Sequence, residues 1–288
     1  MFQRKNFSLR LFLSADMIGS TAFKQNAQVE ARATMEWRMT VLDFLDQVPA
    51  LLRQACLDLS TPNLPEVYKG IGDEIVFVVD LEKNFREAAL YIRAFQVMLE
   101  HFIGDDDLPN VKGAAWLASF PVVNMELEVE RTVVEVVDGL KSPKSINVLE
   151  YIGPQMDIGF RVAKYSTSMK LPLTIDLALL LMTAKLEGYD AARWLRFCYD
   201  GRESLKGVLG EKPYPLVSVL IAGAKELVEL RLLGELPRET ADAGDISDLA
   251  QLCRNFIVTN SPQLFLPYLF DCDTFNLMPE THRKMLIE

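Results

Sequence analysis

This chain has 288 residues, of which 50% are hydrophobic and 24% are charged, a balance typical of a folded globular protein. It contains 30 basic and 40 acidic residues, so its formal net charge is −10. Such acidity disfavours a nucleic-acid-binding surface or an anionic-membrane surface. The length allows one large domain, or a domain of about 200 residues followed by a smaller one.

Neither a targeting signal nor a metal-binding cysteine pattern is visible. The N-terminus lacks the apolar stretch of a signal peptide, and the most apolar run, residues 171–183, is too short to cross a bilayer. The two histidines form no HExxH motif, and no two cysteines form a CxxC pair. We therefore expect a soluble, cytoplasmic protein whose four cysteines are reduced core thiols.

The first elements are predicted as a strand, a turn and a long helix. Leu9–Ala15 is short, apolar and partly alternating, which predicts a strand. Residues 16–21 predict a turn, and residues 22–59 show apolar positions at helical spacing. Pro49 is expected to bend or split this helix.

The middle of the chain alternates between strand-like and helical patterns. Residues 66–80 have two β-prone arms around Gly70–Asp73, which predicts a hairpin with an acidic tip. An amphipathic helix is predicted over 81–102. Two strand-like segments follow at 111–123 and 126–138.

After these strands, residues 141–144 are interpreted as a basic loop. A turn-and-helix unit is predicted over 152–169. The remaining predicted elements of the main body are a short strand at 172–175, a helix at 177–186, and closing strands at 192–199 and 216–220. This alternation predicts an α+β fold with a mixed sheet.

The sequence changes in texture near residue 222. Residues 222–288 hold 6 basic and 11 acidic residues, a net charge of −5, and predict two or three helices around a loop at 237–245. We expect a main domain over 1–221 and an acidic helical C-terminal extension over 222–288.

Two acidic turns are the first candidates for chemistry. Asp16 follows the first strand and precedes a Gly-Ser-Thr turn, and Asp73 lies at the hairpin tip. If the two strands are neighbours, the carboxylates converge and can hold Mg²⁺ or Mn²⁺ together with phosphate oxygens. Taken singly, Asp16 is better explained as a helix cap and Asp73 as a turn former.

Read together, four segments resemble the motifs of class III nucleotidyl cyclases. Phe12–Thr21 resembles the first metal motif and Tyr68–Glu74 the second. Gly153–Ala163 resembles the motif that carries the transition-state residues, and Leu205–Val208 resembles the late lysine motif. Each is weak alone, but all four occur in the family's order.

The resemblance implies a mixed sheet flanked by helices, of the ferredoxin-like cyclase type, and a head-to-tail homodimer with active sites at the interface. It implies two metal ions, Mn²⁺ or Mg²⁺, held by Asp16 and Asp73 with help from the Met17 backbone carbonyl. These ions would activate the ribose 3′-hydroxyl for in-line attack on the α-phosphate, and pyrophosphate would leave.

The resemblance also implies roles for five further residues. Arg161 corresponds to the transition-state arginine and Lys206 to the triphosphate lysine. Lys69 and Glu150 fall where the family reads the base. Asp157 stands where the family has an asparagine that places the ribose, so a standard purine pose is in doubt. An alternative for Asp157 is that it only caps its helix.

Phe160 and Tyr151 add bulk near the pocket, which favours a smaller base. The chain resembles the soluble bacterial pyrimidine cyclases of Pycsar antiphage defence, which have similarly divergent base and ribose motifs. The resemblance implies conversion of UTP to cyclic UMP, a choice over CTP that rests on family frequencies. It also implies a separate effector that reads the product.

Three alternatives stay open. An adenylate or guanylate cyclase is favoured by Lys69 and disfavoured by Asp157. A diguanylate cyclase is suggested by Gly70–Glu74, but it leaves Gly153–Arg161 unexplained. A catalytically silent nucleotide-binding or dimerisation module is the last alternative, against which the retained Asp16, Asp73, Arg161 and Lys206 argue.

Overall fold

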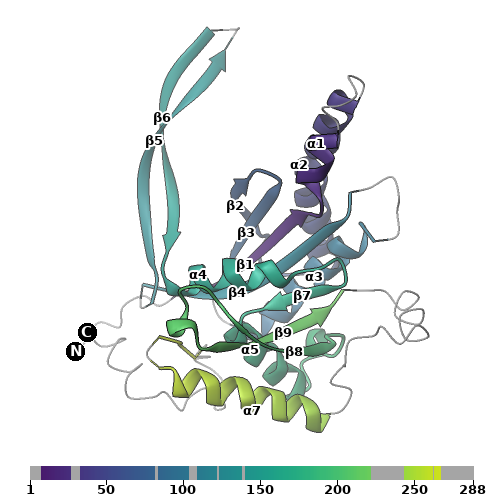
Figure 1. Ribbon diagram of the computed structural model, residues 1–288, viewed down its shortest axis with the longest axis vertical. Helices are drawn as coiled ribbons and strands as arrows, with labels where there is room; N and C mark the ends of the chain where they lie inside the picture. Colours follow the sequence, from purple (N-terminus) through teal and green to yellow (C-terminus); the bar gives the residue numbers. More distant parts are fainter. Residues whose placement is uncertain are drawn as a thin grey trace.

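The computed structural model describes residues 8–26, 33–81, 84–103, 109–121, 123–137, 140–221, 243–261 and 263–266 (Figure 1). Most of the described strands form one seven-stranded sheet with the order β2-β3-β1-β4-β7-β9-β8. Its strands are β1 (Ser8–Met17), β2 (Glu66–Ile71), β3 (Glu74–Asp80), β4 (Val111–Phe120), β7 (Lys170–Leu173), β8 (Phe197–Ser204) and β9 (Pro213–Leu220). Neighbouring strands run antiparallel except for β4 and β7, so the sheet is mixed, as predicted.

The helices flank this sheet. They are α1 (Ser20–Asn26), α2 (Ala33–Asp58), α3 (Ala88–Glu100), α4 (Pro154–Val162), α5 (Ile175–Leu186) and α7 (Ala243–Thr259). Short 3₁₀ turns occupy Phe85–Glu87, Ala163–Tyr165, Asp190–Ala192 and Leu209–Glu211. The predicted α+β class with helices around a mixed sheet is therefore confirmed. Among the described helices, none combines the length and the apolar character needed to cross a membrane.

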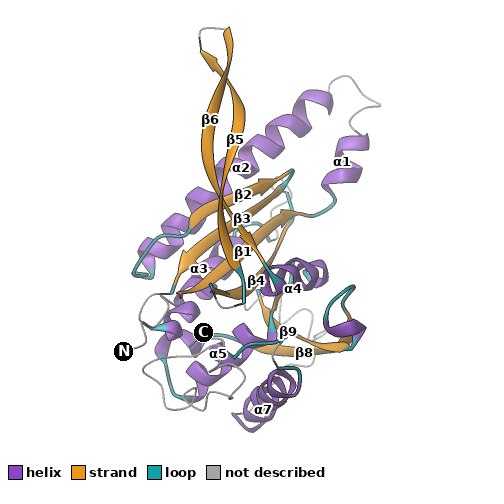
Figure 2. Ribbon diagram, turned by 90° about the vertical axis from the view of Figure 1, so that its left-hand side faces the viewer, coloured by secondary structure: helices purple, strands orange, loops and turns teal. Residues whose placement is uncertain are grey.

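The two faces of the sheet differ in what covers them, because side chains alternate along each strand. Leu11, Leu13 and Ala15 of β1 pack into the main core, which α2 and α3 cover (Figure 2). Phe12 points to the opposite face, where it stacks on Trp116 with ring centroids 5.6 Å apart. Ser14 and Asp16 continue the Phe12 row, so β1 aims them at this second face.

A glycine lets helix α4 lie close against the second face. A Cβ added at Gly159 would lie 2.3 Å from Cγ of Trp116, so only glycine permits this approach. The close contact fixes the height of α4 above the sheet. It thereby positions Phe160 and Arg161, the next two residues of the third motif.

A long two-stranded ribbon leaves the body of the molecule (Figures 1 and 2). It consists of β5 (Met125–Val137) and β6 (Leu140–Ile152), which pair over their full length. The predicted basic loop at 141–144 is therefore wrong, because these residues belong to β6. Pro143, which pairs with Val134, has no backbone N–H to donate. It is tolerated here because the ribbon has only two strands, so no further strand pairs with β6.

Two other boundaries differ from the prediction. Helix α2 runs through Pro49 without being split. The strand predicted at 192–199 begins only at Phe197, because residues 190–192 form a 3₁₀ turn and residues 193–194 form a further turn. The hairpin of β2 and β3 is confirmed, with its turn at Gly72 and Asp73.

Helix α7 confirms one of the helices predicted after residue 222. Ile246, Leu249, Cys253 and Ile257 join the main core, where α7 packs on α5. Residues 222–242 and 267–288, and with them most of the predicted loop at 237–245, lie outside the described residues. The boundary between residues 221 and 222 stays a prediction. Cys56, Cys198 and Cys253 are buried free thiols, and Cys272 lies outside the described residues.

Candidate active site

The two predicted metal aspartates lie at adjacent turns. Asp16 ends the pairing of β1 with β3, opposite Glu74, and Asp73 directly precedes β3. The backbone N–H of Met17 donates to the backbone carbonyl of Asp73 over 3.3 Å. The two strands are therefore neighbours, as the sequence argument required, and both turns sit at one edge of the sheet.

Asp16 has a positive neighbour from the other side of β1. Lys112 pairs with Asp16 in the register of β1 and β4, and its Nζ lies 3.3 Å from Oδ2 of Asp16. Burial raises the pKa of Asp16 above its ordinary value, while the Lys112 ammonium opposes that rise and the nearby Asp73 adds to it. A metal cation bound here would oppose the rise in the pKa of Asp16 in the same way as the Lys112 ammonium does.

Glu74 is the third carboxylate at this edge. Its Oε1 accepts a hydrogen bond of 2.5 Å from the Ser14 hydroxyl. Burial raises the pKa of Glu74, and the Ser14 hydrogen bond opposes the rise. Asp16, Glu74 and Ser14 thus form one polar row beyond the aromatic cluster of Phe12.

A cavity of about 190 Å³ opens on this polar row. The sheet side of the cavity is formed by Ser14, Asp16, Glu74, Lys112 and Gly113. Its other wall comes from α4 and the turn after it, and consists of Phe160, Ala163, Lys164 and Ser166. The cavity therefore combines carboxylates with two ammonium groups, which suits a ligand of phosphate and metal ions.

Arg161 lies on α4 but is not among the residues that line this cavity. Its Nε donates to the backbone carbonyl of Lys206, in the loop between β8 and β9. The structure thus brings the third and fourth motifs together. Lys206 itself is exposed, as is Asp157, one helical turn before Arg161.

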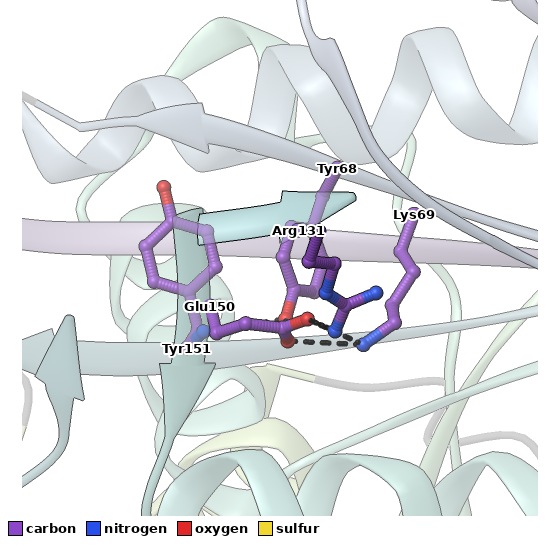
Figure 3. Close-up of polar contacts among 5 residues, drawn as sticks. All are labelled: Tyr68, Lys69, Arg131, Glu150 and Tyr151. Carbon is purple, nitrogen blue, oxygen red and sulfur yellow. Dashed lines mark hydrogen bonds and ion pairs between the residues drawn. The ribbon is translucent and has the colours of Figure 1, made fainter. Parts of the chain in front are cut away.

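The predicted base-reading pair is also in contact. Lys69 on β2 reaches Glu150 on β6, with Nζ 2.9 Å from Oε2 (Figure 3). Glu150 is buried, and hydrogen bonding from Lys69, supported by Tyr68 and Arg131, lowers its pKa below the ordinary value. The acid is therefore a carboxylate at neutral pH.

The side chains at this edge of the sheet could supply some, but not all, of the ligands that a hard divalent cation needs. Asp16 and Asp73 offer carboxylate oxygens, the ligands that Mg²⁺ and Mn²⁺ prefer. Among the residues that the structure describes, no three acidic, histidine or cysteine side chains gather closely enough to hold a metal ion. Oxygens from a bound phosphate would have to complete the coordination.

Sequence reasoning missed Lys112, Arg131 and the contact between Ser14 and Glu74. Alternation along β1 could have placed Ser14 beside Asp16, since both follow Phe12 at even spacing. Lys112 and Arg131 carried no such signal, because their neighbours depend on strand register and on the ribbon.

A scan against protein-family models found no match. A curated relative, ribosomal RNA small subunit methyltransferase G of Nitrosomonas europaea, is 26% identical over 126 residues. That match covers 42% of this chain, and the chain spans 58% of the length of the methyltransferase.

Solved structures of cyclases are similar to this chain. The adenylyl cyclase CyaB from P. aeruginosa has a TM-score of 0.47 at 12% identity, with 77% of this chain and 98% of that chain covered. The guanylate cyclase domain of RhGC from Catenaria anguillulae, in complex with GTP, has a TM-score of 0.48 at 9% identity and covers 75% and 98%. A bacterial light-regulated adenylyl cyclase has a TM-score of 0.44 at 11% identity and covers 81% and 100%.

Proposed function

We propose that this chain is a class III nucleotidyl cyclase that converts UTP into 3′,5′-cyclic UMP and pyrophosphate. The observation that carries the proposal is the meeting of Asp16 and Asp73 at one sheet edge, where the Met17 N–H bonds the Asp73 carbonyl. A cavity with two lysines opens at the same place, which supports binding of a phosphate-rich ligand there.

In the proposed reaction, the ribose 3′-oxygen attacks the α-phosphorus and gives its proton to solvent water, while the bond from that phosphorus to pyrophosphate breaks. Asp16, Asp73 and the Met17 carbonyl would hold two Mg²⁺ or Mn²⁺ ions. When bound, such ions lower the pKa of the hydroxyl and neutralise charge on the phosphates.

The remaining motif residues contact the phosphates and the ribose of the nucleotide in this proposal. Arg161 neutralises charge that grows on the α-phosphate, since its guanidinium matches phosphate oxygens. Lys206 binds the β- and γ-phosphates as a mobile ammonium. Asp157, exposed on the same helix, accepts a hydrogen bond from a ribose hydroxyl.

The site is completed by a second copy in this proposal. In one chain, the cavity at Asp16 is walled by Phe160 and Lys164, whereas Arg161 faces the loop of Lys206. A head-to-tail homodimer would bring Arg161 of one chain to the aspartates of the other. The dimer therefore holds the active sites at its interface.

The choice of UTP rests on the resemblance to pyrimidine cyclases of antiviral defence, with Phe160 as a bulky residue on the wall of the cavity at Asp16. In that setting, cyclic UMP is a signal read by a separate effector. An adenylate or guanylate cyclase is the second candidate, which is favoured by Lys69, the residue type that the resemblance to adenylate cyclases implies at this position, and disfavoured by Asp157.

The test is product formation from each of the four nucleoside triphosphates with Mn²⁺, identified by mass spectrometry. We expect cyclic UMP from UTP. Asp73→Ala should lose this activity at least a hundredfold with an unchanged melting temperature, because a turn substitution costs little stability. Cyclisation of ATP alone would refute the pyrimidine assignment, and no product from any nucleotide would favour a silent binding module.

A further inference from the structure

The carboxylate of Glu150, on β6, is surrounded by donors from two other strands, β2 and β5 (Figure 3). Its Oε1 accepts from Nζ of Lys69 over 3.2 Å and from the guanidinium of Arg131. Its Oε2 accepts from the same Nζ over 2.9 Å and from the Tyr68 hydroxyl over 3.0 Å. Tyr68 and Lys69 lie on β2, Arg131 on β5 and Glu150 on β6.

These four contacts fill the acceptor capacity of the acid. An ionised carboxylate offers about four lone-pair sites, and each of them has a donor of the chain itself. The Glu150 side chain is only 12% exposed. It is therefore an anchor for its neighbours rather than a free acceptor for a ligand.

The groups that remain open to a ligand are donors. The Lys69 side chain is 35% exposed and the Arg131 side chain 49% exposed. A lysine has three N–H donors and an arginine five, so both keep donors that Glu150 does not use. The surface around Glu150 therefore offers hydrogens to a ligand and no free carboxylate oxygen.

We propose, on the basis of the cyclase function above, that this donor surface faces only the exocyclic group of the base and so selects nucleotides with keto bases, and that Arg131 is a specificity-determining residue. The carbonyl at position 4 of uracil or position 6 of guanine accepts from Lys69 or Arg131. The amino group at the same place in cytosine or adenine is a donor and finds no open acceptor on Glu150. Binding of cytosine or adenine is disfavoured, because the amino group would lie unpaired against hydrogen-bond donors.

UTP and CTP are the matched pair for the test, because their bases are the same size and differ at this edge. The probes are their α,β-methylene analogues, which lack the bond that pyrophosphate release breaks. Binding is measured by calorimetry with Mn²⁺ on the full chain. We expect the UTP analogue to bind at least tenfold more tightly than the CTP analogue.

Arg131→Met should shrink this preference severalfold, because it returns one lone pair of Glu150 Oε1 to a base amine. Tyr68→Phe should act in the same direction through Oε2. Lys141→Met is the control, since Lys141 is an exposed residue of the same ribbon, nine residues from Glu150 and so about 30 Å along the strand. It should leave the preference unchanged.

Equal binding of the two analogues to the parent, or a preference that Arg131→Met leaves intact, overturns the inference. Failure of the proposed function gives a different result. A chain that binds the UTP analogue selectively but makes no cyclic product retains the donor surface and is no cyclase. A chain that cyclises CTP and binds both analogues equally is a cyclase without this selectivity.

Discussion

At the scale of single residues, Lys112 is the unexpected neighbour of the proposed metal site. Its ammonium lies 3.3 Å from Asp16, so a divalent cation approaching Asp16 meets a positive charge already in place. Lys112→Met should therefore tighten Mn²⁺ binding by about two- to fivefold, the range expected for a partly exposed ion pair. Calorimetric titration of the nucleotide-free protein measures this directly.

Lys164 provides the matched control for that change. It lines the same cavity from the α4 side and is exposed to solvent. Lys164→Met should alter Mn²⁺ affinity less than Lys112→Met does. An equal effect of the two variants would mean that Lys112 acts through the general field of the cavity and has no special relation to Asp16.

Asp176 is a buried acid outside the proposed catalytic machinery. It accepts from Nε2 of Gln155 over 3.2 Å and from the backbone N–H of Leu177 over 2.9 Å. Burial, only partly opposed by these bonds and by Thr174, raises its pKa from 3.8 to about 6. The folded state therefore holds the proton more tightly than the unfolded state.

This shift gives a stability that falls as the pH rises. Both states are protonated well below pH 3.8; between 3.8 and about 6 the unfolded chain ionises first, and above 6 the loss is complete. A shift of this size corresponds to about 3 kcal/mol. Asp176→Asn should remove that dependence, so urea unfolding at pH 4 and pH 7 should show a smaller difference for the variant. An identical pH profile in both proteins would contradict the raised pKa.

At the scale of elements, the height of α4 above the sheet depends on Gly159. Gly159→Ala would force its Cβ against the Trp116 ring and should cost about 1–3 kcal/mol of stability. Because α4 carries Arg161, the same shift should lower kcat more than it raises KM. Urea unfolding and steady-state kinetics test both effects.

Gly70→Ala is the stability control for this prediction. A Cβ at Gly70 would meet no atom within 4 Å, and its backbone does not require glycine. Its unfolding free energy should change much less than that of Gly159→Ala. If Gly159→Ala is as stable as the parent, then α4 can move off Trp116 without cost.

The elements also show what a sequence can predict. The strand of Leu11 and Leu13 and the hairpin around Asp73 were predictable, because one buried face imposes alternation on them. The extension of β6 over 141–144 was not, since a ribbon that projects from the body lacks a buried face. Asp16 and Asp73 could be placed together from their turns. Lys112 and Arg131 could not, because their contacts depend on the pairing of β1 with β4 and of β5 with β6.

At the scale of the whole molecule, the charge of −10 conflicts with a triphosphate substrate. The structure gathers cations where the proposal needs them. Lys112 and Lys164 line the cavity at Asp16, and Lys69 and Arg131 surround Glu150. A local field of this kind attracts an anion although the chain as a whole is acidic. The net charge therefore disfavours a nucleic-acid or anionic-membrane surface, but it does not disfavour binding of a metal-bound nucleotide.

The separation of Arg161 from Asp16 and Asp73 leads to a prediction about the assembly. If two copies share each site, a chain with Asp73→Ala and a chain with Arg161→Ala are each inactive alone. In a mixed dimer, one site receives both defects and the other receives neither. Random mixing of equal amounts makes half of the dimers mixed, so about a quarter of the parental activity should return in a twofold-symmetric assembly.

The two variants are co-expressed in equal amounts so that mixed dimers form. The rate of cyclic product formation is then compared with that of each variant alone. Mixing two preparations of Asp73→Ala is the control, and it should recover nothing. Activity near zero in a mixture shown to contain mixed dimers would place Arg161 and Asp73 in the same chain's site. In that case α4 would have to turn Arg161 away from the Lys206 loop and toward the cavity when substrate binds, and Gly159 would be the residue that limits this movement.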